Sequence, residues 1–144
     1  MILLDVNILI YASDPISRQQ ASALSWLEAL FGSSGRIGFP WPTIWAFLRI
    51  TTDRRMSTRP RTMASAIERV REWIQQPEVE IVQPGSRHFE ILQRIVLECE
   101  VTGPLMSDAV LAALAIEHGA TLASTDRDFS RFPSLKWVNP LDEG

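Results

Sequence analysis

The chain begins with an almost unbroken apolar run, residues 1–12, in which the only strongly polar side chains are Asp5 and Asn7. A run without alternating polar residues predicts a strand that is buried on both faces, as the strands of parallel sheets are. Asp5 would then lie at or near the carboxyl end of that strand, where open α/β sheets bind their ligands. A buried aspartate needs a partner or a metal ion, although Asp5 would serve equally well as the cap of a following helix.

The rest of the chain alternates segments of helical period with short apolar segments of strand type. Helices are expected over residues 17–31, 43–52, 62–76 and 86–101, and strands near residues 36–39, 79–82, 121–124 and 135–138. Thr43 is expected to cap its helix, and a fifth helix is expected to begin at Ser107 or Asp108. Strands and helices joined by short connections predict an α/β fold with a mainly parallel sheet, as one domain of residues 1–144.

A second group of acids lies in residues 107–129. Asp108 stands at the start of the predicted helix, and Asp126 and Asp128 follow the predicted strand. These acids are expected at the same edge of the sheet as Asp5, where crowded carboxylates raise one another's pKa unless a cation is bound. Hard oxygen ligands in a chain with two His and one Cys favour Mg²⁺, or Mn²⁺, over zinc. The sequence lacks the Gly-rich loop that NTP-binding proteins use to hold phosphates.

Charge and cysteine content narrow the possible functions. The net charge is −3, so a nucleic acid would have to be bound through metal ions or through a local basic patch. The densest basic cluster contains Arg49, Arg54, Arg55, Arg59 and Arg61, which form either a solvated loop or a rim that contacts phosphates. The single cysteine, Cys99, excludes a disulfide within the chain and fits a reducing cytoplasm. No apolar stretch reaches the roughly 18 residues of a membrane span.

Aromatic residues are numerous for a chain of this length, with five Trp and six Phe in 144 residues. Core packing accounts for many of them. The alternative is that some form a binding face, because aromatic side chains are enriched at protein interfaces. We expect an aromatic groove near the first two predicted helices, suited to a helix or an extended segment of a partner protein.

Three segments resemble, in order, the first, third and fourth motifs of the PIN-domain family: residues 3–11, 107–115 and 119–129. Their spacing and the chain length are similar to those of VapC toxins of type II toxin–antitoxin systems. The resemblance implies a PIN-like three-layer α/β/α sandwich. It also implies a cytoplasmic, Mg²⁺-dependent endoribonuclease toxin that cleaves RNA by means of a metal-activated water. The partners implied are a VapB-type antitoxin and a second copy of the chain.

The same resemblance assigns roles to the acids and to one amide. Asp5 and Asp108 would be the main metal ligands, Asp126 would complete the site, and Asp128 would assist. Asn7 would orient Asp5 through a hydrogen bond. These assignments make Asp5, Asp108 and Asp126 the expected catalytic residues.

The helix expected over residues 43–52 departs from the family pattern. Ala46 stands where the family usually has an acid, which leaves the number of bound metal ions open. Thr125 is expected to support the site, and Arg49, Arg54 and Arg55 are expected to contact RNA. The departure keeps open a catalytically weakened or inactive protein that acts by binding RNA or a partner. A receiver-like regulatory domain is a third reading, opposed by the lack of a mid-chain aspartate on a strand.

Overall fold

The computed structural model describes residues 1–142, which form a five-stranded sheet in the order β3-β2-β1-β4-β5. Every neighbouring pair of strands is parallel. The strands are β1 Ile2–Leu4, β2 Ile37–Pro40, β3 Val79–Val82, β4 Thr121–Ala123 and β5 Trp137–Val138. The expected α/β fold with a mainly parallel sheet is therefore confirmed, and the last two residues of the expected domain lie outside the described range.

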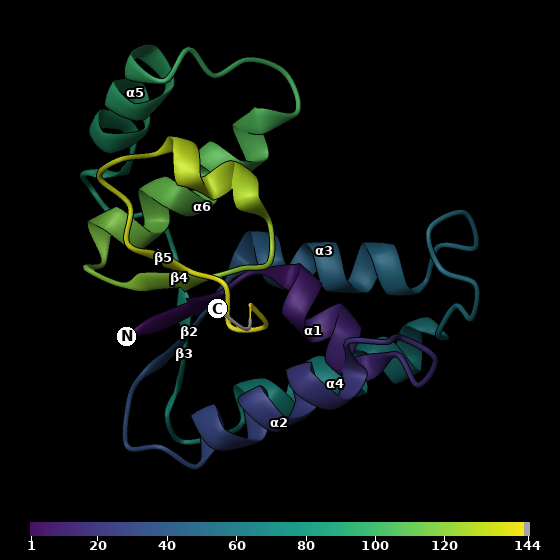
Figure 1. Ribbon diagram of the computed structural model, residues 1–144. Coiled ribbons are helices and arrows are strands. Elements are labelled where there is room, and N and C mark those ends of the chain that lie inside the picture. Colours follow the sequence, from purple (N-terminus) through teal and green to yellow (C-terminus); the bar gives the residue numbers. More distant parts are fainter. Residues whose placement is uncertain (143–144) are drawn as a thin grey trace.

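Helices cover both faces of the sheet and give the three layers of the expected sandwich (Figure 1). One face carries α1 Val6–Ser13, α2 Gln20–Phe31, α3 Trp41–Thr51 and α4 Met63–Ile74; the other carries α5 His88–Glu98 and α6 Leu105–Glu117. Leu3 and Leu4 show the division, because these fully buried neighbours belong to opposite cores. Of the helices in residues 1–142, none is long and apolar enough to cross a membrane.

The N-terminal run does not continue as a strand, which corrects one prediction. Only Ile2–Leu4 is extended, and α1 begins at Val6 with Asp5 as its N-cap. This helix is apolar on most of its surface because it is packed between the sheet, α2 and α3, so its sequence shows no amphipathic period. Asp5 still lies at the carboxyl end of β1, so both its predicted place at the strand end and the reading of it as a helix cap are confirmed.

Two helix starts also differ from expectation. Helix α3 begins at Trp41 after Pro40, and Thr43 is buried inside its first turn. The Thr43 hydroxyl donates to the Leu4 carbonyl oxygen at 2.8 Å and so ties α3 to the end of β1. Helix α6 begins at Leu105, which places Asp108 in the first turn.

The strand order brings the carboxyl end of β1 next to that of β4, where Leu4 is paired with Ala123. The chain builds the sheet outward from β1 through β2 to β3, and then crosses over to β4 and β5. The edge between β1 and β4 is therefore a topological switch point, where open α/β sheets form their binding crevices.

Candidate metal centre

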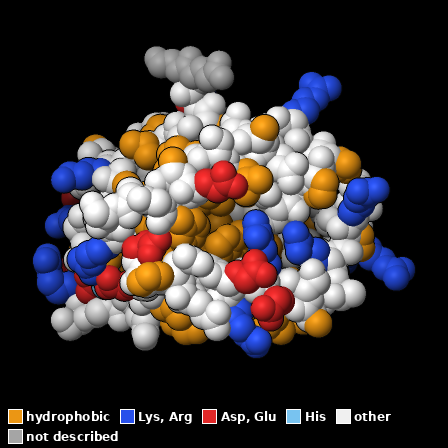
Figure 2. All heavy atoms as spheres, turned by 90° about the horizontal axis from the view of Figure 1, so that it is seen from below, with side chains coloured by type: hydrophobic (Ala, Val, Ile, Leu, Met, Phe, Trp, Pro, Cys, Tyr) orange, Lys and Arg blue, Asp and Glu red, His pale blue; other side chains and the backbone are white. Residues whose placement is uncertain are grey.

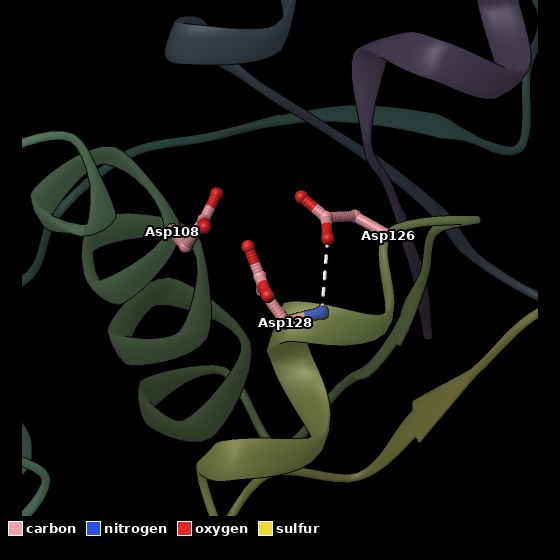
Figure 3. A group of neighbouring side chains, drawn as sticks. All are labelled: Asp108, Asp126 and Asp128. Carbon is pink, nitrogen blue, oxygen red and sulfur yellow. Dashed lines mark hydrogen bonds between the residues drawn. The ribbon is translucent and has the colours of Figure 1, made fainter.

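Three carboxylates meet at this edge. Asp108 projects from the first turn of α6, and Asp126 and Asp128 come from the loop and the short 3₁₀ helix that follow β4. Each offers an oxygen within 4.8 Å of the others, and Figure 3 shows the three side chains directed toward one another. The Asp126 carboxylate is fixed because it accepts a hydrogen bond from the Asp128 backbone N–H at 2.9 Å.

Asp5 lies beside this group but deeper in the protein, and only 8% of its surface is exposed. Its Oδ1 accepts the Val6 N–H at 2.7 Å, and its Oδ2 accepts the Ser124 hydroxyl at 2.6 Å. Asp5 lines the same pocket as Asp108 and Asp126, although it is outside the 4.8 Å group among the described residues. The carboxylate is thus held rigidly at the back of the site.

The acids disfavour one another's charge. Burial raises the pKa of Asp5, hydrogen bonds from Ser124 and Val6 partly offset this, and the Asp126 charge raises it further. Burial, followed by the charges of Asp126, Asp5 and Asp128, raises the pKa of Asp108 to about 6, against a smaller opposing effect of Arg131. A bound cation would remove this electrostatic penalty.

Ser124 joins the parts of the site and was not anticipated from the sequence. The fully buried hydroxyl donates to Asp5, and its oxygen accepts the Asp126 backbone N–H at 3.0 Å and the Asn7 side-chain amide at 3.3 Å. The direct bond expected between Asn7 and Asp5 is therefore replaced by one that passes through Ser124. Thr125 contributes its backbone N–H, which donates to the Asn7 Oδ1 at 3.4 Å. A serine after a strand is ordinary, and only the β1–β4 register reveals its role.

A pocket of about 450 Å³ opens in front of the acids. Its far wall is α3, which contributes Trp45, Ala46 and Arg49. Ala46 occupies the position at which the family usually has an acid. None of the described α3 residues that line the pocket is acidic. Arg49 lies on this wall as an exposed side chain, whereas Arg54 and Arg55 belong to the loop after α3 and do not line the pocket.

The carboxylates fit a hard divalent cation. Oxygens bound to one Mg²⁺ ion are about 3 Å apart when adjacent and about 4.2 Å apart when opposite, so three carboxylates whose oxygens lie within 4.8 Å of one another can approach a shared ion by rotation of their side chains. The donors are all carboxylates, which suits Mg²⁺ or Mn²⁺ rather than a thiolate- or imidazole-seeking metal. Asp108, Asp126 and Asp128 are the closest set to hold the ion, and Asp5, which the resemblance makes a main ligand, lines the same pocket outside this set.

Comparison with known proteins agrees with this geometry. The PIN domain family profile matches residues 2–135. The chain is 38% identical to Ribonuclease VapC33 of Mycobacterium tuberculosis over 143 residues, which cover 99% of this chain and all of that protein. It is 36% identical to Ribonuclease VapC37 of the same species over 140 residues, 97% of each chain. The chain belongs to the PIN-domain family, in its VapC group.

Solved structures show the same fold. VapBC-1 from nontypeable Haemophilus influenzae has a chain that matches with a TM-score of 0.73 at 17% identity, covering 99% of this chain and 100% of that one. VapBC2 from Rickettsia felis, bound to a DNA fragment from its promoter, gives a TM-score of 0.72 at 21% identity, covering 96% and 98%. The PIN-domain resemblance read from the three motifs is confirmed by the family profile and the full-length relatives, and the solved structures confirm the fold.

Proposed function

We propose that this VapC-group protein is a metal-dependent endoribonuclease toxin that hydrolyses RNA phosphodiester bonds. The observation that carries the proposal is the meeting of Asp108, Asp126 and Asp128 beside the buried Asp5, in an open pocket at the switch point of the sheet. The names of the full-length relatives, which are ribonucleases, support the substrate class. The metal proposed is Mg²⁺, with Mn²⁺ as a substitute.

The residues of the chain divide the work. Asp108, Asp126 and Asp128 hold the ion, and Ser124 keeps Asp5 and the Asp126 backbone in register behind it. When bound, the ion supplies the Lewis acidity that makes water nucleophilic and offsets charge on the phosphate. Across the pocket, Arg49 provides a cation for the RNA backbone. Helix α3 places no acid in the pocket that would repel the phosphates.

The proposal is tested by RNA cleavage with Mg²⁺ or Mn²⁺, followed on gels of total cellular RNA. Asp5→Ala and Asp108→Ala are expected to abolish cleavage, and removing the metal with EDTA is expected to do the same. Glu68→Ala is the matched control, because Glu68 is an exposed acid on α4 that forms a surface ion pair with Arg71. Equal cleavage by the wild type and both aspartate variants would refute the assignment.

A second part of the proposal concerns the partner, a VapB-type antitoxin. A groove of about 450 Å³ lies between α2 and α4, lined by Leu24, Leu27, Phe31 and Trp73. Figure 2 views the molecule from this side and shows hydrophobic side chains in a hollow with charged side chains around it. The groove contains Arg69 and Glu72 as well, so it offers both an apolar floor and charges to a bound segment.

We place the expected aromatic partner site in this groove. The sequence suggested a groove near α2 and α3, whereas this one lies between α2 and α4. Co-expression with a cognate VapB-type antitoxin is expected to yield a stable complex that does not cleave RNA. Leu24→Glu is expected to weaken that complex without changing cleavage by the toxin alone. A complex of unchanged affinity would remove the groove from the proposal but leave the nuclease intact.

The toxin is further proposed to be a homodimer, in line with the family resemblance. Light scattering at micromolar concentration is expected to give twice the mass of one chain. A monomer under those conditions would contradict this part.

The neutral α3 wall favours one alternative function. Because Ala46 supplies no carboxylate, the ion has fewer ligands than the family pattern provides, and the protein would then act by binding RNA or a partner without cleaving. The alternative predicts no cleavage with either metal, combined with RNA or antitoxin binding that survives Asp108→Ala. Introducing the acid, Ala46→Glu, is expected under this alternative to create or increase cleavage.

A further inference from the structure

Trp45 is the residue of the pocket that the proposed hydrolysis leaves unexplained. It is 61% exposed, although an indole is one of the largest side chains that a core can bury. Its ring stacks on Trp41 with centroids 6.0 Å apart and planes tilted by 23°. Pro40 precedes the helix and Pro42 lies in its first turn, so the backbone that carries this pair is stiff. The exposed indole is therefore held in place rather than free to fold back onto the surface.

The position of Trp45 points to a role in the site. Trp45 and Arg49 are four residues apart on α3, so they lie on one face of the helix, and both line the pocket that contains the acids. Ala46 next to them is small and leaves space in front of the carboxylates. The wall opposite the proposed metal ligands thus presents an aromatic surface and a cation side by side. Proteins that bind single-stranded nucleic acids combine these two features.

We propose that Trp45 stacks on an unpaired base of the RNA. This base would be next to the phosphate that is bound at the carboxylates, and Arg49 would contact the neighbouring backbone. This inference rests on the proposed nuclease function and adds a residue that positions an unpaired segment of the RNA. A base in a duplex is already stacked on both faces and offers no free surface to the indole. Trp45 is thus a positioning residue, because it orients the strand and does not touch the reacting atoms.

An RNA base is a better occupant for this surface than a protein segment. The exposed indole is continuous with the acidic pocket, and the cation beside it matches a phosphate backbone. The apolar groove suited to a protein segment lies elsewhere, between α2 and α4. A second copy of the chain over Trp45 is the competing occupant that the experiment must separate.

The experiment measures binding of a short, fluorescein-labelled, mixed-sequence RNA, as a single strand and as a duplex, to the non-cleaving Asp108→Asn protein. Adding Trp45→Ala is expected to weaken single-strand binding about tenfold, whereas Trp45→Phe retains most of it because a smaller ring still stacks. Duplex binding is expected to be insensitive to both changes. Phe89→Ala is the matched control, since Phe89 on α5 is 73% exposed and outside the pocket.

Two further readouts exclude a merely structural effect. Single-stranded RNA is expected to quench part of the protein's tryptophan fluorescence, and that part is absent in Trp45→Phe. In the cleaving protein, Trp45→Ala is expected to raise KM about tenfold with a smaller change in kcat.

The outcomes separate the two levels of the argument. A wild-type protein that neither binds nor cleaves RNA overturns the proposed function, and this inference with it. A wild-type protein that cleaves, with Trp45→Ala showing unchanged KM, affinity and quenching, overturns the inference alone. Unchanged affinity together with an altered mass in light scattering would show that Trp45 contacts a second copy instead.

Discussion

Helix α6 carries an acid near each end, and the two carboxylates have opposite environments. Asp108, in the first turn, has its pKa raised to about 6 by burial and by the charges of Asp126, Asp5 and Asp128. Glu117, the last residue of α6, has its pKa lowered: burial acts to raise it, but hydrogen bonds from the Gly85 and Arg87 backbone N–H groups, together with the smaller effects of His118 and His88, outweigh burial. The helix dipole alone would give the reverse, since it stabilises anions at the N-terminus and opposes them at the C-terminus.

The difference separates a carboxylate that stabilises the fold through hydrogen bonds from one that we propose binds a metal ion. Glu117 accepts N–H groups at 2.8 and 3.0 Å and so joins the end of α6 to the turn that leads into α5. Asp108 shares its surroundings with other acids, and a cation is the partner that would satisfy them together. Strongly perturbed acids clustered in a cleft are typical of functional sites. Replacing one of these carboxylates, with the other as the reference, tests whether their roles differ in this way.

The largest expected difference is in RNA cleavage. Asp108→Asn keeps the shape of the side chain but removes a charged ligand, so kcat/KM is expected to fall at least about 100-fold, more than the loss typical of a supporting residue. Glu117→Gln is expected to remain within about twofold of the wild type, because Glu117 is at the other end of α6. Comparable losses in both variants would mean that the effect comes from the fold and not from the site.

Metal binding should divide the two variants next most clearly. At a free Mn²⁺ or Mg²⁺ concentration of about 100 times Kd, binding stabilises the native state by about 2.7 kcal/mol. For a chain of this size that raises Tm by about 10 °C. Thermal unfolding with and without the ion is expected to show this increase in the wild type and in Glu117→Gln, and almost none in Asp108→Asn. An increase that persists in Asp108→Asn would locate the ion elsewhere.

The contrast between these acids was only partly accessible from the sequence. Asp5 and Asp108 could be placed because strand ends and helix starts meet at one edge of a parallel sheet, a rule that needs no side-chain detail. The shortness of β1 could not be predicted, since ten apolar residues fit a buried strand and a buried helix equally well. Asp5 caps α1 in addition to its proposed role as an acid of the site.

Residues that act through the register of distant segments were harder to predict. The role of Ser124 depends on the pairing of Leu4 with Ala123, which brings together segments more than a hundred residues apart. The partners of Glu117 are backbone N–H groups, and although a Cβ at Gly85 would meet the Glu117 carboxylate, a glycine in a turn does not by itself indicate this distant partner. The missing acid at Ala46 was visible from the motif, whereas the pairing of Trp45 with Arg49 on the pocket wall required the structure.

Without metal, Asp108→Asn is expected to stabilise the protein. The folded pKa of Asp108 is above its ordinary value of 3.8, so its ionisation destabilises the native state progressively as the pH rises from about 4 to above 6. The gain from the amide is expected to be about 1 kcal/mol at pH 8, because water screens this partly exposed group, and close to zero at pH 4. Urea unfolding in EDTA at both pH values checks this, and a variant less stable than the wild type at pH 8 would contradict it.

Glu117→Gln is expected to have the opposite and smallest effect. The folded pKa of Glu117 is below its ordinary value of 4.5, so its ionised form stabilises the native state above that pH, and the contribution is lost as the pH falls through the folded pKa. An amide can accept one of the two N–H groups but presents its own N–H to the other, so the free energy of unfolding should fall by about 1 kcal/mol at pH 7. The same urea series is expected to show a loss of stability for Glu117→Gln that shrinks toward acid pH. For Asp108→Asn it is expected to show a gain of stability that grows toward alkaline pH, so the two differences from the wild type have opposite signs. If both variants changed the free energy of unfolding in the same direction at every pH, the ends of α6 would not be electrostatically distinct.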